Sequence, residues 1–160
     1  MSNLVTDEVA ESIGQSVLCW LATVSSDGVP NVSPKEAFLH DGEGSILIAN
    51  IASPVTARNI EQNEKACLSF VNVFVQKGFK VVGTAIVLKP DDDGYDGRLA
   101  KLTAMIGATF PVISIIEITP NSIAEIVAPS YRLFPDSGPE DRIREALAAY
   151  RVEEYRTRAE

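Results

Sequence analysis

The sequence is poor in the residues on which several functional classes depend. It has only two cysteines, two methionines, one tryptophan and one histidine among 160 residues. Two cysteines are too few for a disulfide framework. Both fall in apolar segments predicted to be strands, so we expect buried thiols rather than a disulfide. The sequence shows no zinc-ligand spacing, no serine–histidine–acid set and no paired carboxylates, so we expect no metal site and no hydrolytic mechanism of those types.

Basic residues and long apolar runs are also scarce. The chain has 14 lysines and arginines against 22 acidic residues, for a net charge of −8. Nucleic-acid binding depends on clustered basic side chains, so we expect no nucleic-acid partner. A local positive site for a phosphate-bearing small molecule is compatible with an acidic chain. No apolar run reaches the length of a membrane span and the N-terminus lacks a signal pattern, which predicts a cytoplasmic protein with no membrane partner.

Short apolar segments separated by turn residues predict an α+β fold built on a small antiparallel β-barrel, as one domain over residues 1–160. Strands are expected at 16–24, 30–39, 46–50, 66–73, 79–88 and 111–127, and helices at 5–14, 54–63, 95–107 and 139–151. Residues 111–127 are expected to form one long strand or two short ones, with a break near 119–121, where a proline occurs. In the last helix, Ile143 and Leu147 are expected to face the core.

The segment around Ser53 predicts an anion site. A strand ends at Asn50, and Ser53 followed by Pro54 is typical of a helix N-terminus, with Ser53 as N-cap and Pro54 at the first helical position. Free backbone N–H groups and the helix dipole make such a point suitable for a phosphate. Arg58, together with Lys77 and Lys80 on the following hairpin, would add positive charge. The segment therefore indicates a nucleotide phosphate held beside a β-barrel.

Several residues allow more than one interpretation. Arg58 is either a solvated helix residue or a phosphate ligand. Lys35 either faces the barrel interior, where it needs a partner, or is a charge on an edge strand. Tyr131 in its proline-bounded loop fits a ligand mouth, core packing or a surface bridge equally well. Trp20 is expected in the core or at a dimer contact.

Four segments together resemble the pyridoxamine 5′-phosphate oxidase-like split-barrel flavoproteins. They read NVSPKEAFL from Asn31, LIANIASPVTARNIEQN from Leu47, FVNVFVQKGFKVVGTA from Phe70 and IVAPSY from Ile126. The resemblance covers most of residues 16–131. It implies a six-stranded Greek-key split barrel with short flanking helices, which forms a homodimer and binds FMN at the subunit interface.

The resemblance also implies a set of cofactor-binding positions. Two strand segments would flank the flavin ring, the following loop and helix would hold the phosphate, and one hairpin would reach the flavin from the partner subunit. The residues at these positions are Val32, Ser33, Pro34, Lys35, Ile48, Ala49, Asn50, Ser53, Thr56, Arg58, Asn59, Gln76 and Lys77. Gln76 and Lys77 belong to the hairpin. The resemblance assigns no catalytic residue.

The chain departs from the oxidases proper at two places. Those enzymes have an adjacent arginine–lysine pair at the phosphate, where this chain has Pro54, Val55 and Thr56. They also have a tryptophan in the C-terminal region, and the C-terminal tail of this chain has none. We therefore do not expect oxidation of pyridoxamine phosphate itself. The leading hypothesis is a flavin-dependent oxidoreductase acting on an unidentified small molecule. The alternatives are a non-enzymatic protein that binds flavin, haem or a deazaflavin, and a split barrel that has lost its cofactor.

Overall fold

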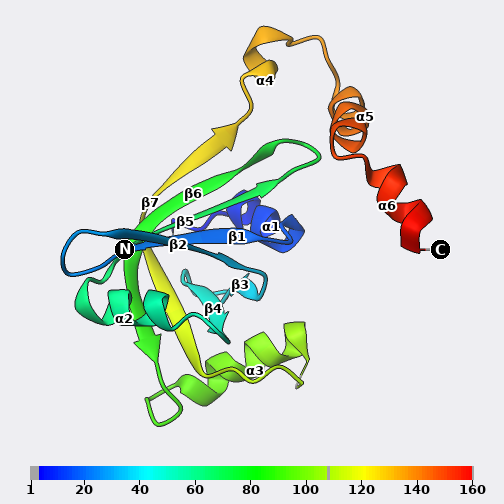
Figure 1. The fold of residues 1–160 in the computed structure, drawn as a ribbon. Helices are drawn as coiled ribbons and strands as arrows, with labels where there is room; N and C mark the ends of the chain where they lie inside the picture. The colour runs from blue at the N-terminus through cyan, green and yellow to red at the C-terminus, as the bar shows by residue number, and fades with distance from the viewer. Residues whose placement is uncertain (1–3, 108, 160) are drawn as a thin grey trace.

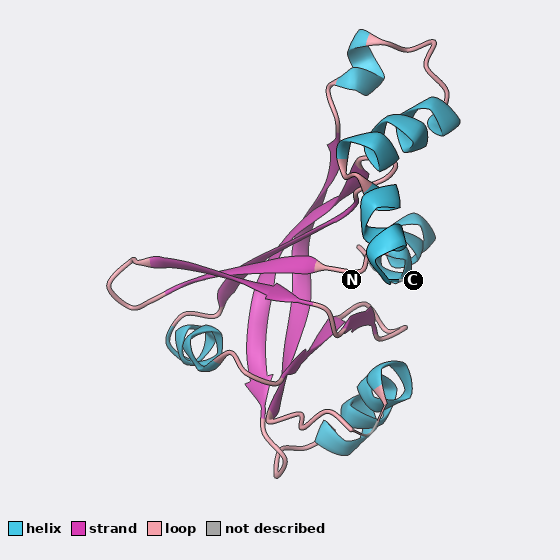
Figure 2. Cartoon of the chain, turned by 45° about the vertical axis from the view of Figure 1, so that its right-hand side comes forward, coloured by secondary structure: helices cyan, strands magenta, loops and turns pink. Residues whose placement is uncertain are grey.

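The computed structural model describes residues 4–107 and 109–159, and within them the chain builds one seven-stranded antiparallel sheet. The strands are β1 (Cys19–Val24), β2 (Pro30–Lys35), β3 (Phe38–His40), β4 (Ile46–Asn50), β5 (Lys65–Asn72), β6 (Lys77–Leu88) and β7 (Ser114–Val127). Across the sheet their order is β2-β1-β5-β6-β7-β4-β3. The sheet is strongly curled, as Figures 1 and 2 show.

The two edge strands of the sheet are neighbours in the chain. Only Glu36 and Ala37 separate β2 from β3, so the chain crosses directly from one edge to the other and holds the sheet in a barrel. The Ala49 N–H donates a hydrogen bond to the Ala37 carbonyl at 2.9 Å, which ties the crossing to β4. The predicted α+β split barrel is confirmed. The expected strand 30–39 is divided at this crossing, which makes seven strands instead of six.

The barrel interior is filled by alternate residues of adjacent strands. Leu21, Phe70 and Val81 point inward from β1, β5 and β6, and Phe38 of β3 meets Phe70 with ring centroids 6.1 Å apart. A second apolar cluster joins α3 to β4 and β7, with Leu102 among its buried members. All five residues of β4 are buried, because the strand is covered by the barrel interior on one face and by α3 on the other.

An irregularity in the β6–β7 ladder agrees with the interruption predicted near 119–121. The register shifts between Val82 and Gly83, where Gly83 lies opposite Pro120. A side chain at Gly83 would collide with the Thr119 carbonyl, so glycine is required there. Proline lacks an N–H for the ladder, and an irregular position tolerates this loss.

Six helices surround this barrel in the described part of the chain. They are α1 (Asp7–Gln15), α2 (Pro54–Gln62), α3 (Tyr95–Ile106), α4 (Ser130–Leu133), α5 (Pro139–Ala149) and α6 (Val152–Ala159). In α1, the Thr6 hydroxyl accepts the Val9 N–H at 3.4 Å, and Val9 and Ile13 join the core. No helix in 4–107 or 109–159 is long and apolar enough to cross a membrane.

Helices α4 to α6, with the residues between them, form a C-terminal arm (residues 130–159) that leaves the end of β7 and stands outside the barrel in Figure 1. The expected inward face of α5 is wrong for Leu147, whereas Ile143 is half-buried. The buried residues of this helix are Arg142 and Ala146, while Leu147 is exposed. The reason is that α5 packs on the segment after α4 through a polar contact and not on the barrel core.

Two expectations about β1 and β5 are corrected in part. Cys19 and Cys67 are free thiols, as predicted, but only Cys19 is buried and Cys67 is half-buried. The Trp20 side chain is 46% exposed on the outer side of β1, so it does not pack in the core.

Candidate functional site

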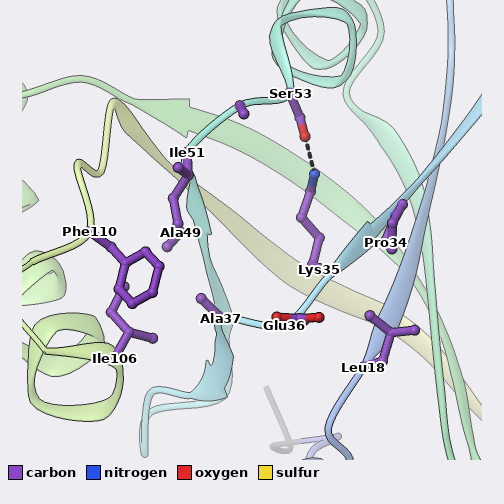
Figure 3. A pocket seen from close by; sticks show the side chains of 11 residues that line it. Leu18, Pro34, Lys35, Glu36, Ala37, Ala49, Ile51, Ser53, Ile106 and Phe110 are labelled. Carbon is purple, nitrogen blue, oxygen red and sulfur yellow. Dashed lines mark hydrogen bonds between the residues drawn. The ribbon is translucent and has the colours of Figure 1, made fainter.

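A cavity of about 430 Å³ opens at the crossing between β2 and β3. Its walls come from the start of β1, the β2–β3 crossing, the end of β4 with the loop into α2, and the end of α3. They consist of Leu18, Pro34, Lys35, Glu36, Ala37, Ala49, Ile51, Ala52, Ser53, Ile106 and Phe110. Figure 3 shows Lys35 and Ser53 pointing toward one another on one side and Phe110 on the other. The cavity thus has one polar corner and a largely apolar remainder.

Lys35 supplies the positive charge of the polar corner. It faces inward, is only 6% exposed, and donates a hydrogen bond from Nζ to the Ser53 hydroxyl. This settles the two interpretations of Lys35 in favour of the interior. Burial lowers the pKa of Lys35, because a desolvated ammonium is disfavoured; the neighbouring Cys19 has the smaller, opposite effect. Burial also raises the pKa of Cys19 to about 12.

The polar corner lies where α2 begins. Pro54 is at the first helical position, as predicted, but Ser53 makes no side-chain cap; its hydroxyl is used by Lys35 instead. The Ser53 N–H donates to the Asn50 side-chain oxygen at 3.1 Å, and the Asn50 amide donates to Ser114 at 2.9 Å, which fixes the approach to the helix. Because no side chain caps the helix, its first N–H groups are suited to an anion.

An uncharged polar layer joins α2 to β1 and β2. The Thr56 hydroxyl lies 2.9 Å from the Ser33 hydroxyl and accepts the Asn31 amide at 3.3 Å. Asn31 and Asn59 each donate an amide N–H to the Thr23 hydroxyl at 3.2 Å. These contacts place Thr56 and Asn59 on the buried face of α2. The layer joins the helix to the strands through hydrogen bonds between hydroxyl and amide groups.

The structure brings most of the predicted positions together around this corner. Those in the cavity wall, in the polar layer or in the approach to α2 are Ser33, Pro34, Lys35, Ala49, Asn50, Ser53, Thr56 and Asn59. Ile48 belongs to the barrel core instead, and the Val32 side chain is 57% exposed. The Arg58 side chain is exposed and contacts no partner among the described residues.

Two predicted residues, Gln76 and Lys77, lie away from the cavity. They are at the turn between β5 and β6, whose tip projects from the barrel away from α2 in Figure 1. Lys77 lies with its ammonium 4.6 Å from the centre of the Tyr131 ring, and Arg142 covers the same ring at 3.8 Å. Of the three interpretations of Tyr131, the structure therefore shows the bridge. We call Lys77, Tyr131 and Arg142 the tyrosine hub.

Sequence reasoning missed several residues of the cavity wall. Ile106 and Phe110 come from the end of α3 and the following loop, which no local pattern connects with β2. Thr23 and Asn31 of the polar layer carried a usable signal, because each is a polar residue at an inward position of an alternating strand. Alternation within β1 and β2 would have placed both on the inward face of their strands.

The comparison with protein families identifies the fold. The model of the pyridoxamine 5′-phosphate oxidase family matches residues 5–129, so the chain belongs to this family. The match contains the barrel and the cavity and ends where the C-terminal arm begins. An uncharacterised protein of Methanocaldococcus jannaschii is 36% identical over 70 residues, which are 42% of this chain and 46% of that relative. The matched region thus spans about half of the relative's length.

Solved structures agree with the family assignment at the level of the fold. The HupZ protein of Group A Streptococcus has a TM-score of 0.63 at 24% identity, covering 74% of this chain and 90% of that one. An FMN-binding protein of Syntrophomonas wolfei has a TM-score of 0.62 at 17% identity over 76% and 86% of the two chains. HutZ, a haem storage protein of Vibrio cholerae, has a TM-score of 0.58 at 23% identity over 77% and 94%.

Proposed function

We propose that the protein is an FMN-binding split barrel whose cavity takes the flavin and whose polar corner takes the phosphate. The observation that carries this proposal is Lys35, a buried ammonium held by Ser53 at the start of α2. A cation beside a helix N-terminus attracts a phosphate by charge and by backbone N–H groups together. Membership of the pyridoxamine 5′-phosphate oxidase family supports the same cofactor.

The residues present fit FMN. The volume of about 430 Å³ is within the range of roughly 300–1,000 Å³ typical of small-molecule sites. Ala37, Ala49 and Phe110 offer small and aromatic surfaces suited to a planar ring, and the polar corner lies at one end. Thr56, which is oriented by Ser33 and Asn31, belongs to the segment 54–56, near which the oxidases proper have their arginine–lysine pair. The charge needed at the phosphate would then come from Lys35 and Arg58.

Haem is the less suitable ligand for this cavity. Among the described residues that line it there is no histidine, cysteine, methionine or tyrosine, the side chains that hold haem iron most often. His40, the only histidine of the chain, lies in β3 beside Asp41 and is not part of the wall.

Titration of FMN into the purified protein, followed by flavin fluorescence, tests the binding site. We expect micromolar or tighter affinity, and at least tenfold weaker binding of riboflavin, which lacks the phosphate. Lys35→Met should weaken FMN binding about tenfold or more while changing riboflavin binding little, because it removes the charge at the phosphate end. Lys80→Met is the matched control, because Lys80 is exposed on β6 and does not line the cavity, contrary to the contribution to the phosphate site expected from the sequence. No FMN affinity at micromolar concentrations would refute the proposal.

Arg58→Ala tests the second cation. Arg58 lies on the exposed side of α2 and its side chain is without a partner among the described residues, so a bound phosphate would be its first contact. Its loss should weaken FMN binding by about 1–3 kcal/mol, the size of a charge-assisted hydrogen bond. Unchanged affinity would remove Arg58 from the site.

We further propose that the FMN-bound protein is a homodimer and acts as an oxidoreductase on a small molecule. Bound FMN supplies the redox chemistry, while the chain binds and orients it and excludes water. Mixing the loaded protein with NADH or NADPH and following flavin absorbance tests this proposal. Bleaching under anaerobic conditions and recovery with an acceptor are expected. A flavin that stays oxidised with both donors would favour a non-enzymatic flavin carrier.

A further inference from the structure

The turn between β5 and β6 has a backbone that needs external support. Gln76 has a φ of 56°, a left-handed conformation that is uncommon for a residue with a side chain. Its N–H donates to the Asn72 carbonyl at 2.7 Å, which closes the turn. Strained backbone of this kind persists where surrounding contacts hold it, and it gathers at functional sites.

The supporting contacts come from the end of β7 and the start of the C-terminal arm. The Ala128 N–H donates to the Gln76 carbonyl at 3.1 Å, and the Tyr131 hydroxyl donates to the Val75 carbonyl at 2.7 Å. Lys77, the next residue of the turn, lies over the Tyr131 ring. Three consecutive residues of the turn are thus each fixed by a different contact from residues 128–131.

Arg142 also contacts the Tyr131 ring. Its guanidinium lies 3.8 Å from the Tyr131 ring centre and is 4% exposed as a residue. It donates to the Ser130 hydroxyl at 2.9 Å and to the carbonyls of Phe134 and Ser137 at 3.0 and 3.3 Å. A cation desolvated against an aromatic face holds it more strongly than an exposed one does. Arg142 therefore holds α4, the following loop and Tyr131 as one unit against the turn.

The turn faces away from the cavity of its own chain. Neither Gln76 nor Lys77 lines that cavity, and Val73 and Phe74 just before them leave apolar side chains 42% and 38% exposed. Lys35 shares a cross-strand row with Cys19, Phe70 and Phe79, so two strands, β1 and β5, lie between its own strand β2 and β6 in the sheet. A hairpin with an apolar tip and a fixed cation is suited to entering a second copy of the chain.

We infer that Tyr131 and Arg142 are positioning residues for the flavin site of the partner subunit. They hold Gln76 and Lys77 in the conformation in which this turn completes the partner's cavity. The inference rests on the proposed function, because it takes FMN as the ligand and a dimer as the binding form. It adds a role for the C-terminal arm, which lies beyond the family match at residue 129.

Single substitutions in the tyrosine hub, each carried by both chains of the dimer, provide the first test of the inference. Arg142→Ala should weaken FMN binding about tenfold and shift the visible spectrum of the bound flavin. Arg142→Lys, which keeps a cation, should recover part of the loss, and Arg144→Ala, an exposed arginine of the same helix, should have no effect. Tyr131→Phe keeps the ring but removes the bond to the Val75 carbonyl and should weaken FMN binding to a smaller extent. It provides a second test should Arg142→Ala fail to fold.

Mixed dimers decide whether the hub acts across the interface. Co-expression of a Lys35→Met chain with an Arg142→Ala chain, each with its own tag, yields a dimer with one defect per chain. If the hub serves the partner's cavity, both defects fall in one site and the other site is wild-type, so half of the sites should bind FMN tightly. If the hub serves its own chain, each site carries one defect and no tight site appears, which would overturn the inference.

Two further results separate this inference from the function on which it rests. Wild-type affinity in Arg142→Ala, with faster amide exchange of residues 72–78, would make the hub purely structural and overturn the inference alone. Failure of the wild-type protein to bind FMN would refute the proposed function, and the role of the hub would fall with it.

Discussion

The barrel and the C-terminal arm are stabilised in opposite ways. The barrel buries a continuous apolar cluster, in which Leu21 of β1, Leu68 of β5 and Ile116 of β7 are fully buried. The arm instead has Arg142 at its centre and leaves Phe134 and Tyr155 more than 60% exposed. A shared apolar core makes a structure unfold as one unit, whereas a single polar centre allows local opening. We therefore expect two cooperative units of unequal stability.

The largest expected effect is in the barrel. Phe70→Ala removes a ring that contacts Phe38 and Phe79 at centroid distances of 6.1 and 6.2 Å. A cavity in so closed a core should cost about 3–5 kcal/mol of unfolding free energy. Urea unfolding followed by far-ultraviolet circular dichroism measures this loss. Phe134→Ala, a change to an exposed ring of the arm, is the matched control and should cost less than about 0.5 kcal/mol. Similar losses of unfolding free energy in the two variants would contradict the expected difference in stability between the barrel and the arm.

The next effect is in the arm. Arg142→Ala removes three hydrogen bonds from a buried guanidinium and one face of the Tyr131 stack, so the local opening free energy of α5 should fall by about 2–3 kcal/mol. Hydrogen exchange followed by mass spectrometry should show faster exchange in 139–149 and unchanged protection in β1 and β4. Loss of protection throughout the barrel would mean that the two regions form a single cooperative unit.

The sequence predicted the barrel well because its signals are local. Alternating apolar strands, the Ser53-Pro54 helix start and the irregularity at Pro120 all depend on neighbouring residues. The number of strands was missed because the crossing at Glu36 and Ala37 is defined by the closure of the sheet and not by a turn signal. The arm was predicted poorly for a related reason. Arg142 occupies the buried position of α5, and only its contacts with Tyr131 and Ser130 explain this.

The candidate site was predictable in type but not in detail. A helix start after a strand indicated an anion site, and Lys35 was recognised as a residue in need of a partner. Its partner, Ser53, was expected to cap the helix, because sequence patterns show which hydroxyl can cap but not which cation competes for it. Ile106 and Phe110 reach the cavity from an element far along the chain, and such long-range contacts leave no local trace.

The pH dependence of stability should also distinguish the two regions. Burial raises the pKa of Cys19 to about 12 from an ordinary 9.0, so above pH 9 the unfolded chain loses a proton that the folded barrel keeps. Stability should then fall by up to about 1.4 kcal/mol per pH unit, or about 2 kcal/mol by pH 10.5. Comparing urea unfolding at pH 8 and pH 10.5 in the wild type and in Cys19→Ala isolates this contribution. Equal slopes would show that Cys19 ionises as easily in the barrel as in the unfolded chain.

The smallest expected effect on stability concerns Lys35. Its pKa is lowered by burial, so burying its charge has a cost to stability as long as Lys35 is protonated in the folded state. The full cost applies below the folded pKa, and it is relieved as the pH rises through the folded pKa toward 10.5, the ordinary value. Lys35→Met keeps the length of the side chain without the charge. It should leave stability at pH 7 unchanged or raise it by up to about 1 kcal/mol, with a gain that shrinks at higher pH.

Lys80→Met provides the matched control for this comparison, since Lys80 is exposed on β6 and its replacement should leave stability and its pH dependence unchanged. A barrel that loses more than about 1 kcal/mol on Lys35→Met would show that the bond to Ser53 stabilises the fold. A Lys35→Met barrel that keeps its stability but loses FMN affinity would show that Lys35 contributes to ligand binding and not to the stability of the fold. In that case the barrel tolerates a desolvated cation because the cation serves a ligand, whereas the arm uses its buried cation, Arg142, to hold itself together.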